Sequence, residues 1–481
     1  MRAAAGRAAL AIAAAAAIVV AGQLVERPAD ERSGTPTASV GPVAVTESDL
    51  VCPGAPLAGL EGVKDIRVAS DVAGQAPLPE RVGVPPVTGQ TGAGELAVRT
   101  PGDSATTAEP GERRVAARGD LGDGALVVGE GERAAGLVAA QQAHLSAEGA
   151  VGGSVAPCTT ARADQWVVAG GGGEGRQERL VLVNPGENPV SVDLTSFAPT
   201  GSSRPTAGQG VVVAPRSRTV LLLDGVTGGR LAQVLRVNAT GGPVGVWVVD
   251  HWVSGLTPRG LEIVPATTAP GRRQVLGAVP TADKVRVVLG APGSRDAIVT
   301  VRAIDDERGH AVGVVTVPAG GTAAIEVPDE DGMAALSVEA DEPVVAAAEI
   351  IDLPDGGGTG EVAWSVATPP VDDLAGAAVP AAVDGLERRL EISAPWGRSE
   401  VEVLTVTAGR TRVEPMTLDR DRSAVVGLGD AEAVWVRRVS GEAPHASMLT
   451  SGRAGGADVL SVTPLLRART SDPSLDVVPL P

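Results

Sequence analysis

The chain has 481 residues and a formal net charge of −18, and 43 % of its residues are hydrophobic. This length predicts several domains with packed cores, and the negative charge argues against nucleic-acid binding, which needs a basic surface. There are six Trp, one Phe and no Tyr beside 63 Gly and 37 Pro. Cores must therefore be built from Val, Leu, Ala and Ile, and many short strands joined by turns are expected instead of a helical bundle.

The amino terminus predicts export from the cytoplasm. Arg2 and Arg7 precede an unbroken apolar run over residues 10–21, in which Val19 and Ala21 fit the small-residue pattern of a cleavage site. The run is shorter than the ~20 residues of a comfortable membrane span. A cleaved signal peptide and an uncleaved signal anchor both remain open for residues 1–25. Residues 26–49 have the Pro, Ser, Thr and Gly content of a disordered linker.

The body of the chain repeats a pattern of strands and turns. Residues 180–186 form an apolar run ending in Asn-Pro-Gly, and comparable runs occur at residues 285–293 and 390–397. Each run is followed by an alternating segment, which is typical of a half-buried strand. The predicted domains are a degenerate first β-repeat over residues 50–158, three further β-repeats over 159–268, 269–370 and 371–466, and a disordered tail over 467–481.

Each copy contains about seven short strands with 8–12 residues between their starts, which favours an antiparallel sandwich. Val190, Val192 and Leu194 illustrate the expected alternation of buried and exposed positions. We therefore expect an all-β chain of tandem immunoglobulin-like antiparallel β-sandwich repeats arranged as a rod. The alternative is a seven- or eight-bladed β-propeller, in which the same strands are divided into four-stranded blades.

The two cysteines, Cys52 and Cys158, predict one disulfide if the chain is exported. The alternative is a pair of buried free thiols. The cysteines lie about one repeat period apart, near corresponding points of successive copies. Such points are usually too far apart in stacked sandwiches for a disulfide, so the pairing favours a propeller or a sandwich that takes its first strand from the preceding linker.

The segment from Gln165 to Gly171, the Asn-Pro-Gly run after Leu180 and the later Val-Val-Val-Ala-Pro-Arg-Ser turn resemble a repeat of secreted actinobacterial proteins. One such group is an uncharacterised family of secreted or membrane-anchored proteins with a domain of unknown function. The resemblance covers most of residues 52–464 and implies an extracytoplasmic location in the cell envelope. It carries no catalytic residue to this chain.

Motifs for chemistry are sparse in the sequence. The four histidines are far apart, so we predict no metal site, no cofactor and no catalytic residues. Acidic turns at residues 305–307 and 329–331 are expected to be solvated, with weak Ca²⁺ binding as the alternative. The densest polar and aromatic cluster is Asp250-His251-Trp252, which follows an apolar strand. We interpret it as a strand-end cap, with a partner contact as the functional alternative.

These features predict a non-enzymatic extracytoplasmic protein of the cell envelope that acts as a binding or scaffolding module. Its expected partners are an envelope protein or a wall polymer, together with the membrane through the N-terminal segment. The alternative function is a cell-wall-active carbohydrate hydrolase or transferase whose carboxylate pair the sequence does not locate.

Overall fold

The computed structural model describes residues 40–57, 67–84, 94–100, 104–119, 121–122, 124–147, 150–170, 173–229, 232–328, 332–353, 359–381, 383–454 and 456–475. The predicted export signal and most of the predicted linker lie outside these residues, as do the acidic turn at 329–331 and the end of the predicted tail. The fold belongs to one compact unit, Val43–Asp472. Strands β1 (Val40–Ala44) and β35 (Ser471–Leu475) lie at its two boundaries.

Residues 47–157 form the first sandwich, which has two antiparallel sheets. One sheet contains, in spatial order, β2 (Glu47–Cys52), β7 (Ala125–Glu130), β4 (Leu96–Thr100) and β5 (Ser104–Thr107). The other contains β6 (Arg114–Gly119), β3 (Arg67–Gln75), β8 (Val138–Ala147) and β9 (Ala150–Pro157). Two short helical turns, α2 (Pro79–Val82) and η1 (Gly131–Arg133), connect strands.

Residues 164–265 form the second sandwich. One sheet contains β10 (Asp164–Ala169), β16 (Gln233–Thr240), β12 (Val190–Ala198) and β13 (Gly201–Ser203), with β14 (Val211–Val213) also paired to β12. The other contains β15 (Ser217–Leu222), β11 (Arg176–Asn184), β17 (Gly245–Ser254) and β18 (Thr257–Pro265). The connecting turns include η2 (Thr206–Gly208) and α3 (Leu223–Thr227).

Residues 271–366 form the third sandwich, in which the long strand β24 (Met333–Asp352) belongs to both sheets. Its first half pairs with β19 (Gly271–Pro280) and β21 (Ala297–Ile304), and β21 pairs with β22 (Gly309–Val317). Its second half pairs with β20 (Lys284–Ala291) and β25 (Glu361–Val366), and β20 pairs with β23 (Gly321–Val327).

Residues 374–467 form the fourth sandwich. One sheet contains β29 (Arg410–Leu418), β28 (Ser399–Thr407), β31 (Ala433–Gly441), β26 (Leu374–Ala378) and β34 (Leu466–Arg467). The other contains β30 (Arg422–Gly427), β27 (Leu386–Ala394), β32 (His445–Ala454) and β33 (Ala457–Pro464).

The predicted all-β antiparallel fold is confirmed, and its connectivity is that of a sandwich. In the second sandwich the chain passes from β10 to β11 in the opposite sheet and returns to the first sheet for β12. It then crosses to the opposite sheet for β15, returns for β16, and crosses once more for β17. A propeller blade would instead be a four-stranded sheet repeated radially from one stretch of chain. The interleaved order therefore contradicts the propeller alternative.

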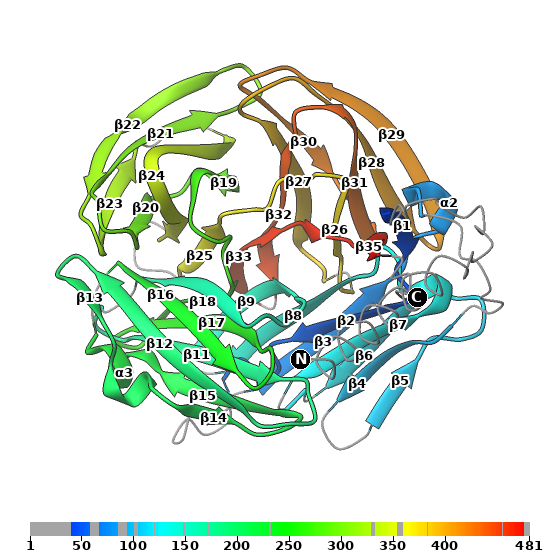
Figure 1. Cartoon of the computed structure of the whole chain (residues 1–481), viewed down its shortest axis with the longest axis horizontal. Coiled ribbons are helices and arrows are strands. Elements are labelled where there is room, and N and C mark those ends of the chain that lie inside the picture. Colours follow the sequence, from blue (N-terminus) through cyan, green and yellow to red (C-terminus); the bar gives the residue numbers. More distant parts are fainter. Residues whose placement is uncertain are drawn as a thin grey trace, which may run out of the picture. The chain divides into compact units, whose positions relative to one another are not determined.

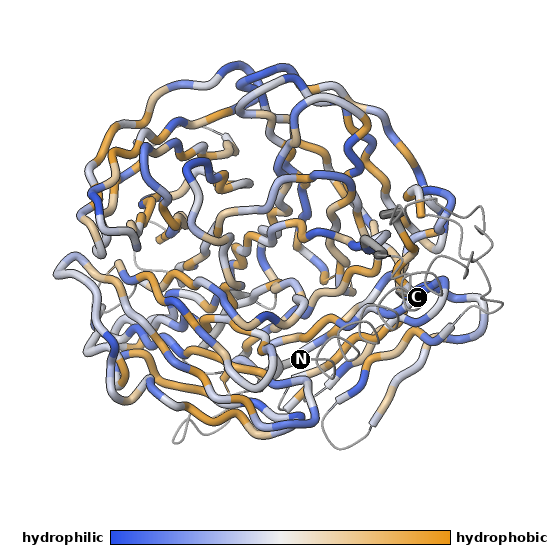
Figure 2. The backbone as a smooth tube through the Cα atoms, viewed as in Figure 1, coloured by the Kyte–Doolittle hydropathy of each residue, from blue (hydrophilic) through white to orange (hydrophobic). Residues whose placement is uncertain are grey.

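The alternating hydrophobic and polar residues of the sequence correspond to buried and exposed side chains along the strands. In β12, Val190, Val192 and Leu194 are 0–1 % exposed, whereas Ser191 is exposed and Asp193 is half-buried. Figure 2 shows hydrophobic residues recurring along the strands and hydrophilic residues at many connecting turns. Branched aliphatic side chains fill these cores, because they pack well on a pleated surface.

The four sandwiches close into a cycle within the unit Val43–Asp472, which corrects the expected rod. Strand β9 contacts β18 and β33, and β25 contacts the same two strands, so the last strand of each sandwich lies near the centre (Figure 1). The first and fourth sandwiches share one hydrophobic cluster. Trp435 of β31 also donates its indole N–H to the Gly136 carbonyl oxygen at 2.9 Å.

Close approach of the central strands depends on glycine. A Cβ at Gly260 would lie 2.5 Å from the backbone nitrogen of Val362, and its φ of +122° disfavours other residues. Polar side chains then join the strands. Ser461 accepts the Val155 N–H at 2.9 Å and donates to Glu262 Oε1 at 2.9 Å.

Candidate functional site

The structure contains a disulfide between the two cysteines. Cys52 ends β2 and Cys158 directly follows β9, and their Cα atoms are 4.3 Å apart. We expected them at corresponding points of successive copies, but both belong to the first sandwich. The bond joins edge strands of its two sheets, so the distance objection to a sandwich does not arise.

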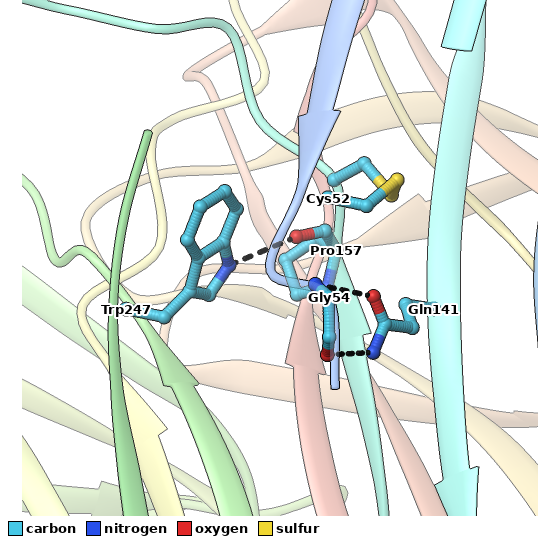
Figure 3. The surroundings of a disulfide bond; sticks show 6 residues. Cys52, Gly54, Gln141, Pro157 and Trp247 are labelled. Carbon is cyan, nitrogen blue, oxygen red and sulfur yellow. Dashed lines mark hydrogen bonds between the residues drawn. A yellow bond between two sulfur atoms is a disulfide. The ribbon is translucent and has the colours of Figure 1, made fainter. Parts of the chain in front are cut away.

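Polar contacts surround the disulfide and connect it to the second sandwich (Figure 3). Gln141 of β8 binds Gly54 twice: its Oε1 accepts the Gly54 N–H at 2.9 Å, and its Nε2 donates to the Gly54 carbonyl at 2.6 Å. The buried Trp247 of β17 donates its indole N–H to the Pro157 carbonyl at 3.3 Å. The disulfide therefore lies at the junction between the first two sandwiches.

A groove of about 550 Å³ lies at this junction, and we call it the junction groove. Its apolar part includes Val51, which precedes Cys52, and Ala125, which pairs with Cys52 in the sheet. This apolar part forms the floor of the groove. Val51 and Thr159 each donate a backbone N–H to the other's carbonyl oxygen at 2.8 Å, and these two hydrogen bonds hold the floor in place. Its lining is completed by residues of the first and second sandwiches: Asp49, Arg99, Thr100, Ser104, Ala105, Gly124, Leu126, Val183, Asn184, Pro185, Glu187 and Arg216.

Charged side chains also line the junction groove. Burial raises the pKa of Asp49, and the nearby Arg99 guanidinium partly opposes that rise. Arg99 donates to Glu95 at 3.4 Å, and Arg216 forms an exposed ion pair with Glu187. The groove thus offers an apolar floor beside carboxylates and guanidinium groups, which suits a ligand with apolar and charged parts.

The predicted cluster Asp250-His251-Trp252 lies in β17, inside the strand and not at its end. Asp250 is completely buried and His251 is 8 % exposed. Burial, with help from Arg179, lowers the pKa of His251 to about 4. Only Trp252 is half-buried, with its indole N–H donated to the Glu174 carbonyl at 3.2 Å. A partner contact through this motif would therefore have to use Trp252.

Asp250 belongs to a buried ion network between the second and third sandwiches. Arg176 of β11 binds Asp250 through Nε at 2.8 Å and Glu349 of β24 through Nη1 at 2.5 Å. Arg286 of β20 binds the other oxygen of Glu349 at 2.5 Å, and Trp364 donates its indole N–H to Asp250 at 2.8 Å. The arginines and carboxylates of this network pair with one another, so its role is structural: it connects the second sandwich to the third.

Sequence reasoning did not find this network, because its members are far apart in the chain: 173 residues separate Arg176 from Glu349. Burial alone lowers the pKa of Arg176, but Asp250 and Glu349 together raise it above the ordinary value. Arg176 also lies over the rings of Trp252 at 5.7 Å and Trp364 at 6.0 Å. These cation–π contacts help to hold the Arg176 guanidinium in place.

Three further carboxyl groups are buried near the centre of the unit. Burial raises the pKa of Glu262 and Glu361 well above the ordinary range, although serine hydroxyls and backbone N–H groups oppose the rise. Burial likewise raises the pKa of Glu391 to about 8, against a bond from the Ala278 N–H at 3.2 Å. Neutral carboxylic acids at these positions avoid the cost of burying charge.

The acidic turn at residues 305–307 is organised by its own backbone. The Asp305 carboxylate accepts the N–H groups of Glu307 at 2.7 Å and Arg308 at 2.6 Å. Across the part of the chain that the structure describes, no group of three or more His, Cys, Asp or Glu side chains could hold a metal ion. Within those same residues, no helix is long and apolar enough to cross a membrane.

No curated protein matches the chain. Solved structures with some likeness include the pilus backbone RrgB from Streptococcus pneumoniae, at 9 % identity and a TM-score of 0.11, over 70 % of this chain and 85 % of that one. A tetra-tandem repeat from the extending region of a large adhesion protein has 14 % identity and a TM-score of 0.10, over 79 % and 94 % of the two chains. The native conformation of E. coli alpha-2-macroglobulin has 12 % identity and a TM-score of 0.11, over 83 % and 28 %.

TM-scores this low support no inference about function. A family model, in contrast, matches residues 113–428, which extend from the first sandwich into the fourth. The chain therefore belongs to a protein family of unknown function, DUF5719.

Proposed function

We propose that this protein is a non-enzymatic extracytoplasmic module of the cell envelope that binds an envelope protein or a wall polymer in the junction groove. One observation carries the proposal: a groove of about 550 Å³ stands on a floor whose strand, β2, is held by a buried disulfide. Disulfides persist in oxidising compartments outside the cytoplasm, and a cross-linked floor gives a ligand site a fixed shape.

The chemistry of the groove supports binding. Apolar side chains such as Val51, Leu126 and Val183 offer contact area, while Asp49 and Arg99 provide opposite charges at one wall. A flat or fully apolar patch would give little orientation to a ligand, whereas a few placed polar groups do so. The N-terminal export segment predicted from the sequence would carry the module out of the cytoplasm.

Two measurements test this function on the full-length protein purified after expression with its own N-terminal segment. The first is intact mass with and without reductant, after alkylation and fractionation. Protection of both thiols before reduction and recovery outside the cytoplasm are expected. Free thiols in a cytoplasmic product would refute the location.

The second measurement is co-sedimentation with purified, insoluble wall polymer, and cross-linking to isolated envelope proteins. Ala105→Trp fills the junction groove from the exposed strand β5 and should abolish capture. Thr107→Trp adds the same bulk to that exposed strand at a position that does not line the groove, and should leave capture intact. Equal capture by both variants would remove the groove from the function. Release of soluble sugar or peptide fragments would support the hydrolase or transferase alternative instead.

A further inference from the structure

Two buried glutamates lie where the inner strands of all four sandwiches come together (Figure 1), and we call them the central pair. Glu262 belongs to β18 of the second sandwich and Glu361 to β25 of the third, and they are 1 % and 2 % exposed. Ser461 of the fourth sandwich donates to Glu262 Oε1 at 2.9 Å, and Ser154 of the first sandwich hydrogen-bonds to the same glutamate. The central pair therefore contacts the strands on which closure of the cycle depends.

One oxygen of each carboxyl group has no hydrogen-bond partner among the described residues. These atoms are Glu262 Oε2 and Glu361 Oε2, and both are buried. Glu361 also packs against glycine backbone: a Cβ at Gly260 would lie 2.7 Å from its Oε2, and a Cβ at Gly152 would lie 3.5 Å from its Oε1. An ionised Glu361 therefore gains a hydration shell only if β18 or β9 moves away from β25.

Acidic side chains face the central pair from neighbouring strands. Burial is the main cause of the raised pKa of Glu262, and Asp250, its partner in β17, adds to the rise. Burial is also the main cause of the raised pKa of Glu361, followed by Glu262 and, more weakly, by Asp458 of β33. Asp352 of β24 pairs with Glu361 in the sheet, and burial raises its pKa as well. Ionisation of the central pair would therefore place further negative charge among carboxyl groups.

Basic side chains do not compensate the central pair. Within the described residues, neither Glu262 nor Glu361 forms an ion pair, not even with Arg259 on β18 itself. Strand β9 has no titratable side chain, and His251 follows Asp250 on β17 and so points to the opposite face of that sheet. The other arginines on or beside these strands have their own partners: Arg176 binds Asp250 and Glu349, Arg272 lies by Glu342, Arg273 lies over the ring of Trp396, and Arg453 lies by Asp458.

We propose that the central pair is a proton-dependent clasp: the inner strands stay packed while Glu262 and Glu361 are protonated, and they separate when these acids ionise. A neutral carboxylic acid is tolerated in a buried setting, whereas an unpaired buried carboxylate is costly. Separation of the strands passes each proton to solvent and hydrates each carboxylate. Because the closed state holds protons that the open state releases, the closed cycle is favoured at low pH, and opening increases as pH rises. The inference concerns the cycle and does not depend on the junction groove.

Hydrogen–deuterium exchange of the full-length protein, measured by mass spectrometry between pH 6 and pH 9, tests the clasp. Exchange times are scaled at each pH for the intrinsic rate of amide exchange. Protection of peptides from β9, β18, β25 and β33 should fall about tenfold per pH unit for each acid that ionises on opening. Peptides from β12, in the other sheet of the second sandwich, should keep their protection. Constant protection of the inner strands, or an equal loss in β12, would overturn the proposal.

Variants assign the effect to the central pair. Glu262→Gln and Glu361→Gln each replace an acid by a neutral side chain of the same shape. Each should halve the slope of the logarithm of inner-strand protection against pH, and the double variant should remove that slope. If the double variant does not fold, the two single variants decide the question.

The matched control is Glu391→Gln, which removes a different buried carboxyl group whose pKa is also raised by burial. The inner strands of this variant should keep the pH dependence of the parent. An equal reduction of the slope in the control would refute the assignment to the central pair, as would an unchanged slope in both single variants.

Discussion

Removing the disulfide between Cys52 and Cys158 should strongly destabilise the folded protein. Cys52 and Cys158 are 106 residues apart in sequence. In the chain-entropy model, a cross-link that closes a loop of that length stabilises the folded state by about 4.7 kcal/mol. Both sulfurs are buried, so replacement by alanine also loses packing of a small side chain. We therefore expect Cys52→Ala/Cys158→Ala to lower the free energy of unfolding by about 3–5 kcal/mol.

The assay is urea denaturation followed by tryptophan fluorescence, comparing the double variant with the oxidised and reduced parent. Trp247, one of the six tryptophans, donates to the carbonyl of Pro157, which is adjacent to Cys158, so part of the emission reports on the junction. The reduced parent and the alanine variant should agree within about 1 kcal/mol, because both lack the cross-link. A loss below about 1 kcal/mol in both would refute the reasoning and indicate that contacts between the sandwiches alone hold β2 in place.

Three further variants test the buried ionisable groups. Arg176→Met leaves Asp250 and Glu349 buried without this cation, so urea denaturation should show the free energy of unfolding lowered by about 3–5 kcal/mol. A decrease below about 1 kcal/mol would contradict the structural role of the network. Because burial raises the pKa of Glu391 from 4.5 to about 8, the folded state retains a proton that the unfolded state releases, and stability falls as pH rises through that window. Glu391→Gln should flatten this slope by about 1.4 kcal/mol per pH unit in unfolding curves between pH 5 and pH 8, and an unchanged slope would reject the buried neutral acid. Burial lowers the pKa of His445 from 6.5 to about 4, so stability is lost as pH falls through that interval; His445→Gln should show a smaller fall in melting temperature on acidification, and an equal fall would assign the effect to other groups.

The sequence was sufficient to predict strands and their alternation, because these are local properties. Val190, Val192 and Leu194 recur with a period of two and are all buried in β12. The disulfide could also be predicted, since an exported chain with two cysteines has only one pairing to form. These inferences needed no knowledge of which segments meet in space.

The cyclic arrangement and the junction groove could not be predicted, because both depend on contacts between distant segments. The Ser461 hydroxyl and the Val155 N–H are 306 residues apart, and no motif marks either one. Asp250 was assigned to a strand end because a charged residue after an apolar run usually ends a strand. It is instead buried inside β17, where Arg176 of the same sandwich and Trp364 of the third sandwich donate to its carboxylate.

The junction groove adjoins the disulfide, and this has a consequence for how ligand capture responds to reduction. The groove uses the β2–β7 sheet of the first sandwich, and the disulfide joins that sheet to the other sheet at their edges. If the disulfide fixes the position of β2, reduction should weaken ligand capture at the junction groove. Capture that is unchanged by reduction would show instead that the pairing of β2 with β7 and the contacts with the second sandwich hold the groove without the cross-link.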